Sequence, residues 1–312
     1  MPNVSGQGTI WNLPNYAGEL FTADAVNTPF LTMIGGMGGG QQTTNFEFPI
    51  DVNYSFAAAA QPSITETASL TAPTAVGYVR AQASNVTQIF HEAVSISYAK
   101  LSNPGRLSGL NTQGSQNDVI SEKDFQIAKA LEKIARDIEY TCLNGVYVLT
   151  TVAGTANTTR GAIANASSTV AASSAKLTKA MIDSLLKSMY DAGAMFKQPV
   201  IWVNSFQKQV LSDIYGFAPM DRMVGGVNVE SIETDFGTVG VKLNRFMPAA
   251  TLLVADMAAI QPVFQPVPGK GNFFYEELSK TGASENGQIF GQFGLNHGDG
   301  VLSGSITGLA TS

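Results

Sequence analysis

The strongest hydrophobic pattern in the chain is helical and runs from about residue 119 to residue 144. Its apolar positions are spaced four and three residues apart, which places them on one stripe of an α-helix: Ile127, Leu131, Ile134, Ile138 and Cys142. The pair Asn144-Gly145 predicts a stop with a left-handed glycine. At about 1.5 Å per residue the helix spans roughly 35 to 40 Å. We therefore expect it to be the spine of the subunit, with the stripe in its core.

A second pattern has a period of two and predicts a strand from residue 46 to residue 56. Its apolar positions are expected to share one face: Phe46, Phe48, Ile50, Val52, Tyr54 and Phe56. A low-complexity segment follows, and the chain returns through residues 77–86, which together predict a long two-stranded arm. Because an isolated two-stranded ribbon is marginally stable in water, we expect this face to pack on a surface outside its own core.

Shorter patterns predict further helices and strands. Helices are expected at residues 177–192 and 205–215, buried strands at 200–203 and 252–255, and a hairpin that turns at Asp235 to Gly237. Residues 1–42 are expected to form an arm with two apolar patches, one at Leu20 and Phe21 and one at Phe30 and Leu31. Because helices and strands alternate without regular βαβ spacing, the fold class is predicted to be α+β.

Composition adds a hint of large interfaces. Of the 312 residues, 44% are hydrophobic, which is enough for one large or two moderate domains. Charged residues make up 13%, about half of the ordinary ~25%. An uncharged polar surface is buried at less desolvation cost than one rich in Lys and Glu, so the deficit indicates protein interfaces. Compositional drift explains it equally well.

Charge placement argues against tight nucleic-acid binding. The net charge is -6, and the residues before Arg80 include five acidic side chains and no Lys or Arg. A protein that neutralises many phosphates needs clustered basic residues. The chain also has no apolar run long enough to span a bilayer and no secretory signal, and its single cysteine excludes an internal disulfide.

No catalytic, cofactor or metal site is predicted. The run HEAVS at His91 begins like a zinc-protease motif, but Ser95 stands where the second histidine would be, and nothing places His297 beside His91. Cys142 lies on the apolar stripe, so it is interpreted as a small core residue and not as a nucleophile. Two acidic groups, 118–124 and 230–235, could bind a divalent ion, but helix-start electrostatics and a solvated strand face are the preferred interpretations.

Several runs along the chain resemble a known family. They are NYAGELF and TPFLTMIGG in the arm, IFHEAVSISY before the spine, and GFAPMDRMVGGVNVESIETDFGTVGVKLNRFMP after it. In these runs the chain resembles the major capsid proteins of tailed bacteriophages with the Hong Kong 97-type fold, and most closely their SU10-like branch. The resemblance extends from about residue 15 to residue 309.

The resemblance implies a domain plan: an N-terminal arm at 1–42, an extended loop at 43–90, a peripheral domain at 91–174 and 259–312 built on the spine, and an axial domain at 175–258. It implies assembly with itself into hexamers and pentamers of an icosahedral shell around double-stranded DNA. Portal, scaffolding and decoration proteins are implied as partners, contact with DNA is expected to be weak and non-specific, and the protein is expected in the virion capsid after synthesis in the host cytoplasm. The family's type member cross-links through a lysine in this loop, whereas the first lysine here is Lys100.

Two other classes of function stay open on the sequence alone. An encapsulin-like compartment shell shares the fold implied by the resemblance. An outer-membrane barrel fits the Gly, Thr and aromatic content, but it needs a signal peptide and evenly repeated strands, and neither is evident.

Overall fold

The structure is a computed structural model, and it describes residues 28–54, 59–74, 77–78, 80–102, 122–216, 230–280 and 282–311. Its helices are α1 (Pro29–Met33), α2 (Glu66–Ser69), α3 (Tyr98–Ser102), α4 (Glu122–Asn144), α5 (Ala162–Asn165), α6 (Lys179–Asp191), α7 (Ser205–Tyr215) and the 3-10 turn η1 (Gly300–Leu302). Its strands are β1 (Gln41–Gln42), β2 (Glu47–Tyr54), β3 (Arg80–Val86), β4 (Gln88–Ser97), β5 (Ser168–Ala171), β6 (Pro199–Val203), β7 (Ser231–Thr234), β8 (Gly237–Leu243), β9 (Leu252–Asp256), β10 (Gln261–Phe264), β11 (Phe273–Glu277), β12 (Ser284–Asn296) and β13 (Ser303–Thr307). The fold is therefore of the mixed α+β class.

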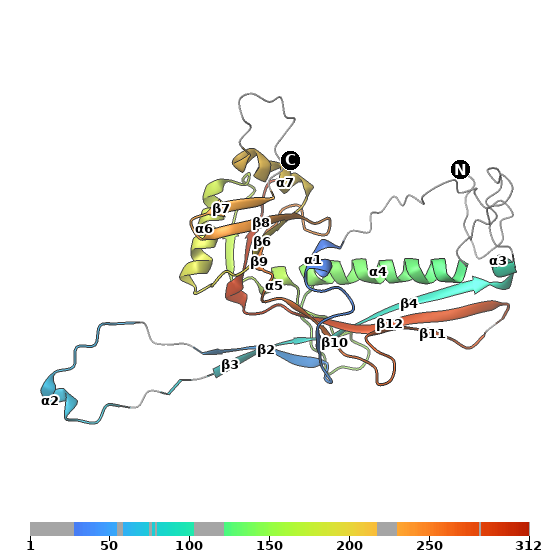
Figure 1. Ribbon diagram of the computed structural model, residues 1–312, viewed down its shortest axis with the longest axis horizontal. Coiled ribbons are helices and arrows are strands. Elements are labelled where there is room, and N and C mark those ends of the chain that lie inside the picture. The colour runs from blue at the N-terminus through green and yellow to red at the C-terminus, as the bar shows by residue number, and fades with distance from the viewer. Residues whose placement is uncertain are drawn as a thin grey trace, which may run out of the picture.

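A five-stranded sheet and the helix α4 form the elongated part of the subunit. Strand β12 is central, because it pairs in antiparallel register with β4, with β11 and with β10, and β1 adds a short parallel pair to β10. Helix α4 runs along this sheet (Figure 1). It ends at Asn144 as predicted, and residues 119–121 of the predicted start lie outside the described residues.

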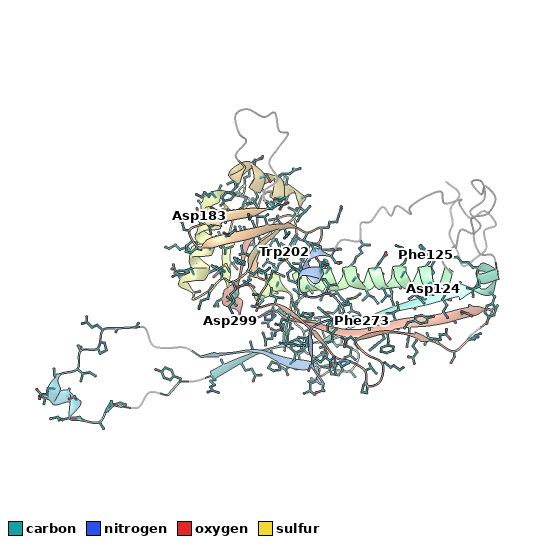
Figure 2. All side chains as sticks on the ribbon, in the orientation of Figure 1. Asp124, Phe125, Asp183, Trp202, Phe273 and Asp299 are labelled. Carbon is teal, nitrogen blue, oxygen red and sulfur yellow. The ribbon has the colours of Figure 1, made fainter. Side chains whose placement is uncertain are left out.

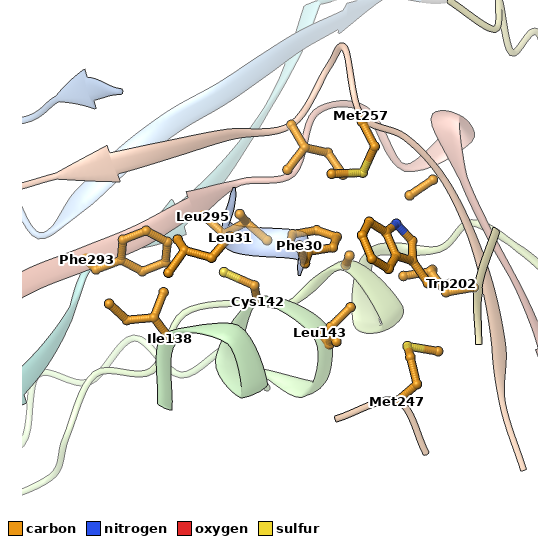
Figure 3. Packing of buried hydrophobic residues seen from close by; sticks show 14 of the residues in the cluster. Phe30, Leu31, Ile138, Cys142, Leu143, Trp202, Met247, Met257, Phe293 and Leu295 are labelled. Atoms are coloured by element: carbon orange, nitrogen blue, oxygen red, sulfur yellow. The ribbon is translucent and has the colours of Figure 1, made fainter. Parts of the chain in front are cut away.

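The apolar stripe of α4 faces the sheet. Ile134, Ile138 and Cys142 are buried, and Ile127 and Leu131 are partly buried against the same cluster. Figure 3 shows Ile138, Cys142 and Leu143 on the helix together with side chains from the sheet and from α1. Burying one such aliphatic side chain contributes about 1.5 to 3 kcal/mol relative to leaving it exposed.

Close packing, and not a left-handed turn, accounts for the glycine at the end of α4. The φ of Gly145 is not positive, so the prediction of a left-handed stop is wrong. A Cβ at this position would overlap the backbone carbonyl oxygens of Thr159 and Thr141. The N–H of Gly145 donates to the Thr141 oxygen (2.8 Å), and its own carbonyl oxygen accepts from the N–H of Gly161 (2.9 Å). Only a residue without a side chain lets these two backbone segments meet.

A six-stranded sheet, in the order β5-β13-β9-β6-β8-β7, forms the second part of the molecule. Helix α6 starts with Thr178 as its N-cap and α7 with Asn204, and both caps accept a backbone N–H. Gly193 follows α6 with a φ of 100°. The helices, the strands β6 and β9, and the hairpin of β7 and β8 match the predicted elements closely.

The central strands of this sheet are buried on both faces. On β6, Val200 and Trp202 face the cluster that contains α4, while Ile201 and Val203 face a second cluster that contains α6 and α7. Strand β9 alternates in the same way. Trp202 accordingly lies between the six-stranded sheet and the spine (Figure 2). The six-stranded sheet therefore lies between two hydrophobic cores and contributes side chains to both.

Two strands of this sheet come from outside the expected axial range of 175–258. Strand β5 pairs in parallel with β13, and β13 pairs in antiparallel register with β9. Both strands are short and rich in Ser, Thr and Gly, so they show no apolar alternation in the sequence. The six-stranded sheet thus includes residues from outside the range that the resemblance implies for the axial domain.

Truncation of Ile134 to Ala is expected to lower the free energy of unfolding of the subunit by about 2 to 5 kcal/mol, because the change leaves a cavity against the sheet. Thermal or urea unfolding of the isolated subunit measures this. The control is Tyr140→Ala, which changes a mostly exposed side chain on the same helix and should cost well under half as much. Equal stabilities of wild type and Ile134→Ala would show that the stripe is not part of the core.

Candidate functional site

The candidate site is a surface and not a pocket. Strands β2 and β3 pair only with each other among the described strands, in antiparallel register from Glu47 opposite Val86 to Tyr54 opposite Arg80. The ribbon extends away from both sheets, and α2 lies at its far end (Figure 1). A two-stranded ribbon of this kind has two open edges and no helix covering it.

The six apolar residues predicted for one face of the ribbon do not form one continuous stripe. The register shifts between Pro49 and Asp51, so a bulge at Ile50 interrupts the alternation. Phe46 precedes β2 and is 48% exposed, whereas Phe48 is 4% exposed. The side chains of Val52 and Tyr54, and all of Phe56, lie outside what the structure describes.

Phe48 belongs to the packing of its own subunit. A Cβ on Gly294 in β12 would lie 2.7 Å from the ring of Phe48, so the glycine leaves a notch that the ring fills. The expectation that Phe48 is free for a neighbouring molecule is therefore wrong. The physical reason is that the base of the ribbon lies on the five-stranded sheet, where Phe48 packs against β12.

A buried polar network fixes the base of the ribbon. The amide nitrogen of Asn85 donates to the carbonyl oxygens of Arg160 (3.1 Å) and Leu295 (2.8 Å), and its amide oxygen accepts from the N–H of Arg160 (2.8 Å). The N–H of Thr87 donates to the carbonyl oxygen of Phe46 (2.8 Å). Both Asn85 and Thr87 are buried. A buried amide with these partners holds one orientation, so the ribbon leaves the body at a defined angle.

The far end of the ribbon is ordered around the short helix α2. Thr65 caps this helix by accepting the N–H of Ala68 (3.2 Å). The flanking side chains Ile64 and Leu70 are 73% and 84% exposed. This end therefore presents apolar side chains that nothing in the described subunit covers.

The arm residues Phe30 and Leu31 are buried inside the subunit. They lie in α1, and the ring of Phe30 packs against Trp202 with 5.2 Å between centroids. Figure 3 shows both side chains between the spine and the strands. The other predicted patch, Leu20 and Phe21, lies outside the described residues. At Phe30 and Leu31 the arm therefore packs on its own chain.

A buried carboxylate holds α1 in place. The two oxygens of Glu139 in α4 accept the backbone N–H groups of Phe30 (2.8 Å) and Leu31 (2.7 Å), and Oε1 also accepts from the amide nitrogen of Asn244. Glu139 has no exposed surface. Burial raises the pKa of its carboxyl, and the three hydrogen bonds partly offset that shift by favouring the charged form.

Glu139 thus joins three parts of the molecule. The arm supplies the two N–H groups, the spine supplies the carboxylate, and the segment after β8 supplies Asn244. The apolar pattern of the helix did not single out Glu139, because a charged side chain does not contribute to an apolar stripe. The available signal was its spacing: Glu139 lies one residue after Ile138 and three before Cys142, on the apolar side of the helix.

The two histidines have separate environments. His91 is exposed on β4, and its Nε2 lies 3.0 Å from Oε1 of Gln288. His297 is buried in the turn after β12, where burial lowers the pKa of its imidazole to about 4. Burial also raises the pKa of the Cys142 thiol. Across the described residues there is no group of three His, Cys, Asp or Glu side chains that could hold a metal ion.

The described part of the chain also contains no helix that is both long enough and apolar enough to cross a membrane.

Comparison with known proteins gives one family and a set of distant structural relatives. A family model described as SU10 major capsid protein matches residues 3–310. No curated protein matches the chain in sequence. The chain is similar to the capsid asymmetric unit of cyanophage A-1(L), with a TM-score of 0.66, 13% identity and coverage of 96% of this chain and 98% of that one.

Two further solved structures share the fold. One is the capsid of a native GTA particle, with a TM-score of 0.61, 10% identity and coverage of 96% of both chains. The other is the holo-SrpI encapsulin complex from Synechococcus elongatus PCC 7942, with a TM-score of 0.55, 10% identity and coverage of 95% and 94%. At these identities the likeness shows a fold, of the Hong Kong 97 capsid type.

Replacement of Glu139 by Gln is expected to loosen α1. One carboxylate oxygen becomes an NH₂ group that faces a donor, so at least one buried N–H of Phe30, Leu31 or Asn244 loses its acceptor, at a cost of about 1 to 3 kcal/mol. Hydrogen exchange of the amides of residues 29–34 should speed up, and the subunit should unfold at a lower temperature. The control is Asp137→Asn, a half-exposed position on the same helix that pairs with Lys133. Unchanged exchange at Phe30 and Leu31 in Glu139→Gln would contradict this role.

Acidification is expected to destabilise the subunit through His297. Its pKa is lowered from 6.5 to about 4 in the folded protein, so the unfolded chain binds the proton first, and stability is present above pH 6.5 and is lost as the pH falls towards 4. At about 1.4 kcal/mol per pH unit the loss is about 3 kcal/mol. Urea unfolding between pH 4 and 7 measures it. His297→Asn should flatten this part of the profile; equal slopes for wild type and His297→Asn would refute the assignment.

Proposed function

Because the chain belongs to the SU10 major capsid protein family, we propose that its copies form hexamers and pentamers through the extended ribbon. The chain is a major capsid protein and a structural protein, not an enzyme, and copies of it form the icosahedral head shell of a phage. The ring-shaped units, the roles of the parts and the further partners are the proposal.

The single observation that carries the proposal is the uncovered ribbon. Strands β2 and β3 leave the subunit as a pair with two open edges, and apolar side chains at the far end are exposed. Such a feature is a liability in a protein that works alone, because open edges and apolar ends promote association. In a shell subunit the same feature provides the contact with a neighbour.

We assign roles to the parts in line with the fold. The segment up to residue 42 is the arm, and α1 within it is the part fixed to the body by Glu139. Residues 43–90 are the extended loop. The spine and the five-stranded sheet are the peripheral domain, and the six-stranded sheet, widened by β5 and β13, is the axial domain. Strands β6 and β9 contribute side chains to both hydrophobic cores, which supports a rigid connection between the peripheral and axial domains.

The interactions between copies are proposed to be non-covalent. Residues 43–90 contain no lysine, so this loop offers no amine for a lysine cross-link. Scaffolding, portal and decoration proteins are proposed as further partners of the shell. Packaged double-stranded DNA is proposed to touch it weakly, because the net charge is -6 and no basic cluster precedes Arg80.

An encapsulin-like compartment is the second candidate, favoured by the structural likeness to the SrpI encapsulin complex. The fold alone does not separate the two classes, whereas the family match over residues 3–310 favours the capsid.

Negative-stain microscopy of the purified protein tests the proposed function most simply. Closed shells, or rings with five-fold and six-fold symmetry, are the expected result. A protein that stays monomeric at all concentrations, alone and when expressed with the other head proteins of its phage, would contradict it.

Protection of the ribbon on assembly is the expected accompanying result. Elastase cleaves after small residues such as the alanines of the segment 59–74, where the described side chains are exposed. Cleavage there should be at least several-fold slower in particles than in dissociated subunits, as followed by mass spectrometry of the fragments. Cleavage elsewhere in exposed loops serves as the internal control. Equal rates in the two states would show that the ribbon is not an assembly element.

A further inference from the structure

An ordered hairpin beside the base of the ribbon carries a second uncovered apolar surface. It runs from Gly145 to Gly161, the two glycines that approach each other at the end of the spine. Val148 and Thr158 exchange both backbone hydrogen bonds at 3.0 Å, and the N–H of Thr150 donates to the side-chain oxygen of Asn157 (3.0 Å). These bonds give the hairpin a fixed shape.

Four apolar side chains of this hairpin are accessible. Val146 and Val152 are 68% and 67% exposed, and Val148 and Leu149 are exposed to a smaller extent. From Val146 to Thr159 the chain contains no charged residue. The single charge of the hairpin is Arg160, whose guanidinium carbon lies 4.9 Å from the ring centre of Tyr147. The hairpin therefore exposes apolar side chains and carries one cation.

The far end of the ribbon has the complementary character. Ile64 and Leu70 are its largest exposed apolar side chains, and they lie on either side of α2. The only charged residue between 59 and 74 is Glu66, an acid. The far end of the ribbon thus combines exposed apolar side chains with one anion, which is opposite in charge to the one cation of the hairpin.

The two surfaces lie at opposite ends of the same ribbon. The hairpin is tied to the ribbon base because Arg160 bonds Asn85 through its backbone and Thr159 accepts the N–H of Leu295 (3.2 Å). The helix α2 marks the other end of the ribbon, away from both sheets (Figure 1). Contact between two different surfaces placed at the two ends of one arm is a head-to-tail contact, and such a contact closes into a ring when the rotation is suitable.

We propose that the hairpin at residues 145–161 is the seat for the ribbon end of the next copy of this chain in the ring. In this contact Ile64 and Leu70 cover Val146 and Val152, and Glu66 faces Arg160. The inference rests on the proposed function, since it identifies which surface of the neighbour receives the ribbon. Each subunit places its ribbon end on one neighbour and binds the ribbon end of the other neighbour. In a closed ring, therefore, every ribbon end and every hairpin is covered.

Cysteine cross-linking in particles tests the contact. Leu70→Cys and Val152→Cys are combined in one chain, and particles are treated with a short bis-maleimide and separated on a denaturing gel. The native Cys142 is buried and contributes little background. The expected result is a ladder of linked chains that extends to the ring size. Each single variant should give no ladder.

A matched control is Leu70→Cys combined with Met195→Cys, because Met195 is similarly exposed but lies after α6. A ladder of equal strength in this control, linked dimers from Val152→Cys alone, or the absence of a ladder in the main variant would each overturn the inference. The experiment first requires that the wild-type protein forms particles. If it forms none, the proposed function is contradicted; if particles form but give no ladder, only the contact inferred here is contradicted.

A charge exchange gives an independent readout. Glu66→Arg and Arg160→Glu should each reduce the yield of particles several-fold, and the two changes together should restore most of it. Thermal melting of the free subunits separates folding defects from assembly defects, because Arg160 also packs on Tyr147. Additive losses in the double variant, with all subunits folded, would overturn the pairing of these two side chains.

Discussion

The carboxylate of Glu139 is the interaction on which the arrangement of this subunit depends. An ion with no exposed surface is costly unless it is fully hydrogen-bonded, and its partners come from the arm, through Phe30 and Leu31, and from the segment after β8, through Asn244. The donors belong to different parts of the chain. If either part moved away from the spine, the buried carboxylate would lose hydrogen bonds. The carboxylate therefore helps to fix the relative placement of α1, the spine and the six-stranded sheet.

The rest of the described structure consists of a closely packed body and a two-stranded ribbon that extends from it. The body is stiff because β6 and β9 contribute side chains to both hydrophobic cores, so the six-stranded sheet cannot shift against the spine without repacking. Two contacts hold the base of the ribbon on this body. The buried amide of Asn85 hydrogen-bonds the neighbouring backbone, and the ring of Phe48 fills the notch at Gly294. Its direction is thus set by the body, while its far end remains uncovered. This division is what the proposal requires, namely that copies of the chain are joined through the ribbon.

Sequence patterns predicted the elements whose apolar residues form a regular pattern. The spine, α6 and α7 show a helical period, whereas β6 and β9 are short continuous apolar runs that are buried on both faces. The errors have specific physical causes: the bulge at Ile50 breaks the alternation of the ribbon, Gly145 serves close packing instead of a positive φ, and β5 and β13 have too few apolar residues to show a period. Glu139 was missed because the type of a residue does not reveal whether donors from distant segments surround it.

A reconstruction of the assembled particle at side-chain resolution is the most direct test of the central claim, that a rigid body held together at Glu139 is joined to its neighbours by the ribbon. The account predicts that α1, the Glu139 carboxylate and Asn244 keep the same contact in every subunit, whether in a pentamer or a hexamer, and that residues 59–74 of each subunit lie on an adjacent copy. Ribbons that point into solvent, or subunits in which α1 has left Glu139, would contradict it.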